Sequence, residues 1–353
     1  MSGRFITFAQ AINEALSQAM ENDPKVITFG LGVGDPKEIF GTTSGLQEKF
    51  GAERVFDMPT AENAMTGVAI GASLQGYRPV MVHQRLDFFL LAMDQLVNGA
   101  AKWHFMFGGQ KSASIVIRLV IGRGWGQGPT HSQSLHAWFA HIPGLKVVMP
   151  TTPADAKALL LGAIEDPNPV VFLEHRWLHN TTGEVLEAPV PAPLGKARVR
   201  RDGADVTIVS MGFMTVEALY AADYLADNGV YCEVIDLTSI NPIDWPCLRD
   251  SVKKTGRLLV LDTGALTGSV AGEIVARLSE ELWSSLRSAP ARIAMPDIPE
   301  PTSFMLTKEF YPRAENIIEK IQQMSGVKQI KGTLNRETSY PHDVPGDWFT
   351  GPF

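Results

Sequence analysis

The sequence predicts an α/β protein with two doubly wound domains, each built on a mainly parallel sheet. Short apolar, β-branched runs alternate with longer helical stretches along most of the 353 residues. The runs are almost continuously apolar, as in strands that are covered on both faces of a sheet. The alternation stops once, in a proline-rich stretch, and then restarts, which at about 100–200 residues per domain indicates two domains.

In the N-terminal half, expected strands are interspersed with expected helices. We expect strands at residues 26–29, 79–82, 114–119, 146–149 and 170–173, and helices at 9–21, 61–74, 90–102 and 153–164. Thr152 precedes Pro153 and Asp155, which is the order of a cap, a first-turn proline and an acid near the positive end of a helix.

The pattern breaks at residues 187–194, where prolines exclude a long helix or a central strand. We therefore assign residues 1–185 to a first domain, 186–204 to a linker, 205–324 to a second domain and 325–353 to a tail. In the second domain we expect strands at 206–210, 232–235 and 258–262, and helices at 215–228 and 269–286. The tail lacks a core of its own, so it needs a surface on which to lie.

Composition excludes several classes of protein. The net charge of −7 is not the basic excess of a nucleic-acid binder. No apolar run approaches the roughly 20 residues of a membrane span, and the first residues do not read as a signal peptide. Cys232 and Cys247 are too few for a disulfide scaffold, so we expect a cytoplasmic protein.

Common nucleotide-binding and hydrolase motifs are incomplete or missing. Gly30, Gly32 and Gly34 follow a predicted strand, but the third glycine of a dinucleotide-binding loop is absent and no helix pattern starts there. The sequence also contains no phosphate-binding loop of the G-x-x-x-x-G-K-[ST] type and no G-x-S-x-G elbow.

Glu62 begins the predicted helix 61–74, where an acid favourably meets the helix dipole. The helix is small and apolar almost all round, which predicts deep packing, and a desolvated carboxylate there suits proton exchange. Both roles, dipole partner and proton exchanger, remain open for this residue.

His131 ends the glycine-rich stretch 122–131, which either makes a turn or lets the backbone approach a ligand closely. His136 and His141 follow at intervals of five residues, without neighbouring cysteine or acidic ligands, and read as packing or capping residues.

Many blocks recur together in the order and spacing of one family. They include Asp57-Met-Pro-Thr-Ala-Glu62, Asp87-Phe88, and residues 71–79, 93–98, 131–134, 143–148, 163–169, 194–197 and 233–237. Over residues 4–322 the chain resembles the β subunit of thiamine-diphosphate-dependent 2-oxoacid dehydrogenases of the pyruvate, branched-chain and acetoin types. The resemblance implies a pyrimidine-binding domain followed by a transketolase C-terminal-like domain.

The resemblance also implies a cofactor site shared between two polypeptides. In this family an α subunit holds the diphosphate and its Mg²⁺ through a Gly-Asp-Gly motif, which this chain lacks. We therefore expect an obligate α partner and an α2β2 assembly.

The resemblance assigns roles to four side chains. Glu62 aligns with the glutamate that hydrogen-bonds the pyrimidine N1′ and favours its imino form. Phe88 aligns with an aromatic residue packed on the pyrimidine, although a core role fits it equally well, and Gln84 is a candidate for the same wall. His131 aligns with the histidine near the substrate carbonyl, where it can donate a hydrogen bond or a proton.

A structural K⁺ is a further implication of the resemblance. Its expected oxygen ligands come from Ile115, Ala163, Ile164, Asp166 and Asn168. Hard oxygen donors suit such an ion, but an ordinary turn at the end of the helix explains these residues as well.

The chain departs from the family pattern at Arg85, where relatives have an apolar or aromatic residue, and around Arg123 and Trp125. The two arginines could meet an anionic or phosphorylated substrate, or face solvent and form salt bridges.

The favoured function is that of a catalytic β subunit that decarboxylates a 2-oxo acid and passes the acyl unit to the lipoyl group of a transacylase. A two-subunit carboligase or transketolase-like enzyme, with an aldehyde, ketone or sugar as acceptor, is the alternative. A non-catalytic β-like subunit is disfavoured, since it would need neither Glu62 nor His131.

Overall fold

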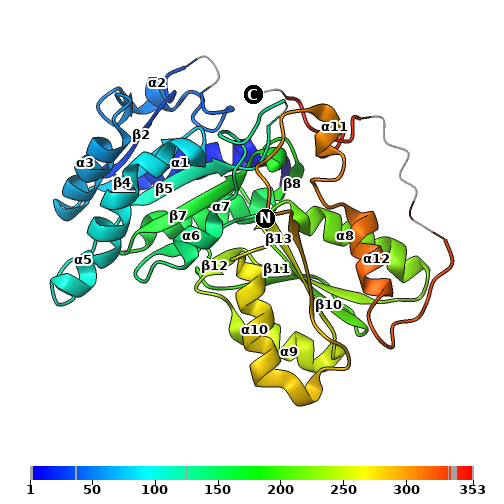
Figure 1. The fold of residues 1–353 in the computed structure, drawn as a ribbon. Coiled ribbons are helices and arrows are strands. Elements are labelled where there is room, and N and C mark those ends of the chain that lie inside the picture. The colour runs from blue at the N-terminus through cyan, green and yellow to red at the C-terminus, as the bar shows by residue number, and fades with distance from the viewer. Residues whose placement is uncertain (1–2, 36–37, 125, 333, 335–339, 352–353) are drawn as a thin grey trace.

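The structure is a computed structural model that describes residues 3–35, 38–124, 126–332, 334 and 340–351, so Trp125 lies outside the described residues. Two parallel-rich sheets with helices around them form the two halves of the molecule (Figure 1). The predicted α/β class, with two doubly wound domains, is confirmed.

The first sheet has seven strands in the order β12-β6-β7-β5-β4-β2-β3. They are β2 (Val26–Gly30), β3 (Val55–Asp57), β4 (Arg78–His83), β5 (Val116–Ile121), β6 (Lys146–Val148), β7 (Val170–His175) and β12 (Ser239–Asn241). Six of these strands are parallel to their neighbours, and every residue of β5 and β7 is buried, as expected for central strands.

The helices of this half are α1 (Phe8–Asn22), α2 (Leu46–Phe50), α3 (Glu62–Leu74), α4 (Leu86–Phe89), α5 (Ala101–Met106), α6 (His136–Ala140) and α7 (Pro153–Glu165), with short turns η1 (Leu90–Ala92), η2 (Gln95–Ala100) and η3 (Arg176–Leu178). Helices α1 and α7 pack against each other and bury Leu16 and Leu160 in one apolar core. A two-stranded antiparallel ribbon, β1 (Arg4–Thr7) with β8 (Thr182–Val185), joins the two ends of this half.

The second sheet has the order β14-β13-β10-β11-β9. Its elements are β9 (Arg198–Arg201), β10 (Val206–Ser210), α8 (Met214–Asp227), β11 (Cys232–Asp236), α9 (Trp245–Thr255), β13 (Leu258–Ala265), α10 (Val270–Leu282), η4 (Trp283–Ser285), β14 (Ala291–Met295), α11 (Phe304–Thr307) and α12 (Ala314–Gln322). Strand β9 is antiparallel to β11, so the predicted linker 186–204 contains an edge strand of the second sheet.

The two halves are interleaved in the chain. Strand β12 follows β11 in sequence but pairs antiparallel with β6 of the first sheet, and the Asn241 side-chain amide donates to the Leu145 carbonyl at 2.9 Å. Arg200 of β9 pairs with both Asp155 of α7 and Asp236 of β11. One guanidinium between two carboxylates thus fixes the halves relative to each other.

Two predicted helices differ from expectation. Residues 90–102 are not one α-helix but the turn η1, the π-helical stretch η2 and the start of α5. Helix α3 does not pack on all sides, because its outer face leaves Asn63, Ala64 and Val68 exposed, with 57% of Val68 accessible. Within the described ranges, no helix is both long and apolar enough to cross a membrane.

Candidate active site

Parallel strands bring the predicted site residues to one edge of the first sheet. Strands β5, β4, β2 and β3 lie side by side, and the loops and helix starts that follow β3, β4 and β5 carry Glu62, Gln84, Phe88 and His131. The carboxyl ends of parallel strands are where α/β proteins bind their ligands.

Glu62 is the first residue of α3 and only 7% exposed. Among the residues that the structure describes, its carboxylate has no hydrogen-bond partner, and the contact nearby is made by its own backbone carbonyl, which accepts from Thr66 Oγ1 at 2.8 Å. The side chain is mostly buried, but its oxygens are not among the fully buried, unpartnered atoms of the described residues, so a ligand at this edge can reach them. This orphaned group suits the ring nitrogen of an aminopyrimidine.

Phe88 and His131 meet at this edge. Their rings are 5.3 Å apart between centroids and nearly perpendicular, at 88°. Phe88 is half-buried and His131 is exposed, with its Nδ1 3.0 Å from Thr130 Oγ1. The other ring nitrogen of His131 is therefore available to a substrate.

Gln84 lies against the loop that follows β2. A Cβ on Gly32, whose φ is +80°, would lie 2.1 Å from the Gln84 amide nitrogen. The backbone amides of Gly32 and Val33 donate to Asp57 Oδ1 at 2.7 and 3.2 Å. A glycine is thus needed at position 32 because the Gln84 side chain lies directly against its backbone. This close packing explains the glycine without a dinucleotide.

Two acids at this edge were not singled out from the sequence as site residues. One oxygen of Asp87 accepts a hydrogen bond from Gln133 Nε2 at 2.6 Å. The pKa of Glu300 is raised, mainly because the side chain is buried and also because the negative charge of Asp87 is near. Glu300 comes from the second half of the chain, so its closeness to Asp87 could not be predicted from the local sequence.

Arg85 does not face solvent, contrary to one of its two sequence interpretations. It is buried, donates to the Gly122 carbonyl at 2.8 Å, and contacts the Gln127 side chain. Burial, and then the positive charge of Arg176, lower the pKa of Arg85 to about 10. The hydrogen bonds of Arg85 hold the glycine-rich loop. Because its pKa is about 10, the guanidinium is charged at neutral pH.

Arg123 is also buried and belongs to the chain's own packing. It donates to the Pro301 carbonyl at 2.8 Å and pairs with Asp343 at 3.0 Å. Neither arginine is exposed, and the partners of Arg123 lie in the second half and the tail, so a solvent-facing role is wrong for both.

The oxygens of the expected K⁺ site are gathered where α7 ends. The carbonyls of Ile115, Ile164 and Asp166 accept hydrogen bonds from Val170, Arg78 and Ser114, respectively. The Asp166 carboxylate pairs with Lys146 and accepts from the Asn168 amide at 2.9 Å. Each carbonyl has a second lone pair that can accept a cation, and two positive side chains, Arg78 and Lys146, already contact this oxygen set.

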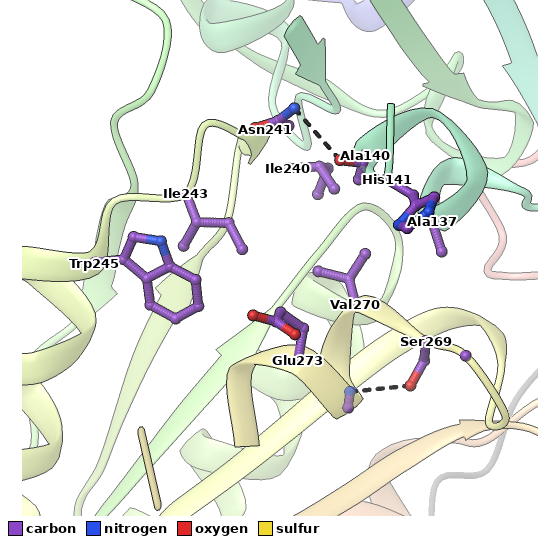
Figure 2. A pocket seen from close by; sticks show the side chains of 12 residues that line it. Ala137, Ala140, His141, Ile240, Asn241, Ile243, Trp245, Ser269, Val270 and Glu273 are labelled. Carbon is purple, nitrogen blue, oxygen red and sulfur yellow. Dashed lines mark hydrogen bonds between the residues drawn. The ribbon is translucent and has the colours of Figure 1, made fainter. Parts of the chain in front are cut away.

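A cavity of about 630 Å³ lies away from this edge, between α6, β12 and the start of α10 (Figure 2). His141, Trp245 and Glu273 face it, and none of the predicted catalytic or cofactor-binding residues lines it. His136, which begins α6, pairs instead with buried Asp262 of β13 at 2.9 Å, in agreement with a packing role.

Three further histidines are buried in neutral form. Burial lowers the pKa of His83 to about 3, and burial with nearby positive groups lowers that of His175 to about 3 and that of His179 to about 4. On unfolding each returns to about 6.5, so the unfolded chain binds more protons below that pH. These histidines therefore leave the free energy of unfolding unchanged above about pH 6.5 and lower it as the pH falls toward 4 for His179 and toward 3 for His83 and His175.

We expect the urea midpoint to drop between pH 7.5 and 5.5, with each histidine contributing up to about 1.4 kcal/mol per pH unit below 6.5. His83→Gln should flatten this slope, whereas His141→Gln, at an exposed position, should not. Equal slopes in all three proteins would contradict the assignment.

The fold and this edge define a two-domain chain of the transketolase type. The family described as transketolase, pyrimidine binding domain, matches residues 5–181, and transketolase, C-terminal domain, matches residues 195–317. A solved split-gene transketolase, described as an inactive beta4 tetramer, superposes with a TM-score of 0.74 at 25% identity, covering 92% of this chain and 99% of that one.

Relatives with higher sequence identity show which family within this class the chain belongs to. The chain is 40% identical to the pyruvate dehydrogenase E1 component subunit beta-2 of Oryza sativa subsp. japonica, over 89% of this chain and 84% of that protein. It is equally identical to the acetoin:2,6-dichlorophenolindophenol oxidoreductase subunit beta of Cupriavidus necator, over 89% and 96%. The 2-oxoisovalerate dehydrogenase subunit beta of Bacillus subtilis also shares 40%, over 83% and 90%. The chain belongs to the family of thiamine-diphosphate-dependent 2-oxoacid dehydrogenase E1 β subunits.

Proposed function

We propose that this chain is the β subunit of a heteromeric enzyme that decarboxylates a 2-oxo acid and transfers the acyl unit to a lipoyl group on a transacylase. The observation that carries the proposal is the buried carboxylate of Glu62, left without a partner among the described residues at the carboxyl edge of the sheet. The relatives that share 40% identity support the same reaction class.

The partner would supply the half of the site that this chain lacks. Within the part of the chain that the structure describes, no three His, Cys, Asp or Glu side chains gather as a metal site, and the sequence has no Gly-Asp-Gly motif. We assign the diphosphate and Mg²⁺ to an α subunit in an α2β2 assembly. The cytoplasm is the proposed compartment, because both cysteines are free.

An apolar surface supports an α partner. Val68 of α3, Leu91 of η1 and Phe105 of α5 are 57%, 71% and 88% exposed. Helices α3 and α5 lie on the outer side of the first half (Figure 1), and η1 contacts α3. Large apolar side chains exposed on neighbouring elements are typical of surfaces that a partner covers. Glu62 begins one of these helices, so the partner would close over the site.

Four residues of this chain would each have a distinct role in the reaction. Glu62 would hold a proton at its carboxylate against the cofactor's pyrimidine, with Phe88 and Gln84 flanking the ring. When bound, thiamine diphosphate supplies the carbon nucleophile and the electron sink for decarboxylation. His131, exposed beside Phe88, would donate a hydrogen bond or a proton at the substrate oxygen during acyl transfer.

The proposal is tested by co-expressing the chain with an α chain that carries the Gly-Asp-Gly motif. With thiamine diphosphate and Mg²⁺, the purified pair should consume a 2-oxo acid and acylate a lipoyl domain. Turnover with a dye or an aldehyde but none with lipoyl protein would favour the carboligase alternative, to which the split-gene transketolase likeness points. Failure of the two chains to co-purify would contradict both.

A K⁺ bound by oxygens of Ile115, Ala163, Ile164, Asp166 and Asn168 is a separate proposal. The ion would tie the end of α7 to the start of β5, and ligands that bind the folded state stabilise it. The thermal midpoint should be a few degrees higher (about 2–4 °C) in KCl than in choline chloride of equal ionic strength. Equal midpoints would mean that Arg78 and Lys146 supply the positive charge there instead.

A further inference from the structure

The end of the chain lies back across both halves of the molecule. We call residues 341–349 the C-terminal strap; it begins beyond residue 317, where the match to the family's C-terminal domain ends. In Figure 1 its red ribbon lies beside α11, close to the junction of the two halves. The strap has no regular helix or strand, so side-chain contacts hold it.

Its contacts to the second half are made by Arg313 and Phe304. The Arg313 guanidinium donates to the carbonyls of His342 and Val344, both at 3.0 Å. The His342 ring lies 4.0 Å from the Phe304 ring between centroids, and its Nε2 is 2.7 Å from the Phe304 carbonyl. These bonds fix the position of the residue between them, Asp343.

Its contacts to the first half reach the turns that follow β5 and β7. Asp343 pairs with Arg123 at 3.0 Å, and both side chains are almost fully buried, at 4% and 1% exposure. Further along, Trp348 Nε1 donates to the Trp177 carbonyl at 3.1 Å. The Arg176 guanidinium lies 5.1 Å from the centre of the Phe349 ring.

Arg123 opens the loop that leads to His131. Gly122 and Gly126 have φ angles of +73° and +69°, and glycines leave a backbone many alternative conformations. These two glycines would permit other backbone conformations if no side chain held the turns around them. The bonds of Arg123 to Asp343 and to the Pro301 carbonyl hold its first turn, and those of Arg85 hold the Gly122 carbonyl.

We propose that Asp343 of the C-terminal strap is a positioning residue that fixes the glycine-rich loop and, through it, the place of His131 beside Phe88. A buried guanidinium needs a compensating charge, and Asp343 provides it for Arg123. If Asp343 loses its charge, Arg123 can leave its place, and the loop can adopt other conformations. The effect on turnover rests on the proposed function of His131, whereas the effect on the loop does not.

The loop is tested by hydrogen–deuterium exchange on the full-length chain. Asp343→Asn should speed amide exchange in residues 122–124 and 126–131 by about tenfold or more, while exchange in β5 stays unchanged as a sign that the fold is intact. Asp347→Asn is the matched control, because it makes the same change at an exposed position of the same strap. Equal exchange in the two variants would overturn the proposal, whatever reaction the enzyme performs.

Turnover is tested in the assembled α–β pair. Asp343→Asn should lower kcat about tenfold with little change in KM for the 2-oxo acid, because a misplaced group affects the reaction more than binding. Asp343→Glu should restore part of kcat, and Asp347→Asn should leave kcat unchanged. A kcat equal to wild type for Asp343→Asn would overturn the positioning role. An inactive wild-type pair would instead speak against the proposed function and leave the exchange result standing.

Discussion

Replacing Glu62 by glutamine is expected to lower kcat of the assembled enzyme by at least about 100-fold, the usual contribution of a proton-transferring group. Glutamine keeps the shape of the side chain and can still form hydrogen bonds, but it cannot hold a proton as a carboxylic acid. The partnerless, buried position of the carboxylate is the reason to expect a loss of reaction rate rather than of folding. Steady-state kinetics on the variant paired with the α chain measure it.

Glu48→Gln is the control for this change. Glu48 is also an acid in the first turn of a helix, α2, but it is exposed. Both substitutions remove the same helix-dipole interaction, worth about 0.3–1 kcal/mol. Activity lost equally in both variants, or retained in Glu62→Gln, would remove Glu62 from the chemistry and favour a non-catalytic subunit.

Glu174→Gln is expected to cause the largest loss of stability, about 3–5 kcal/mol. In the centre of the first sheet, Arg118 of β5 donates to both oxygens of Glu174 on β7, at 2.6 and 3.0 Å, and neither side chain is accessible to solvent. Glutamine leaves the guanidinium charge buried without its counterion. Urea denaturation followed by circular dichroism should show the lower midpoint.

Two further variants test whether the uncompensated charge of Arg118 causes the loss of stability in Glu174→Gln. Asp223→Asn removes one partner of an exposed pair with Arg201 and should cost less than about 1 kcal/mol. The double change Arg118→Met with Glu174→Leu removes both buried charges and should recover most of the lost stability. A double variant as unstable as Glu174→Gln would show that packing, not the uncompensated charge, is responsible.

The Arg118–Glu174 pair also gives acid sensitivity at low pH. Burial alone would raise the pKa of Glu174, but Arg118, with help from His179, lowers it overall to about 2. The pair's contribution is thus complete above about pH 4.5 and is lost as the pH falls toward 2. The buried histidines act at higher pH, so the two effects are separable in a pH series.

The positions of the central strands were predictable because each contains a run of mostly apolar residues. Val170–His175 and Val206–Ser210 have every residue buried, and both were expected within two residues at either end. Helix α7 was predictable from its cap, with Thr152 accepting from the Asp155 amide at 3.2 Å. Periodicity and capping are local properties, so the sequence contains them directly.

Long-range contacts were not predictable. Strand β12 joins the sheet of the other half, and Arg123 pairs with a residue 220 positions away. An arginine that departs from a family pattern suggests a ligand, but its actual partner depends on which distant segment returns to it. The exposed outer face of α3 was missed because an apolar helix looks the same whether a core or a second polypeptide covers it.

By itself the sequence determined the α/β class and the central strands with their main helices, because these follow from local apolar patterns, and its recurring blocks pointed to the candidate residues at the carboxyl edge of the first sheet. Only the tertiary structure decided which groups there are left without partners and which are taken up by packing. Glu62 is left free among the described residues, while Arg85 and Arg123 hold a loop. The physical reason is that a buried charge is defined by its neighbours in space, which the chain brings together only when it folds.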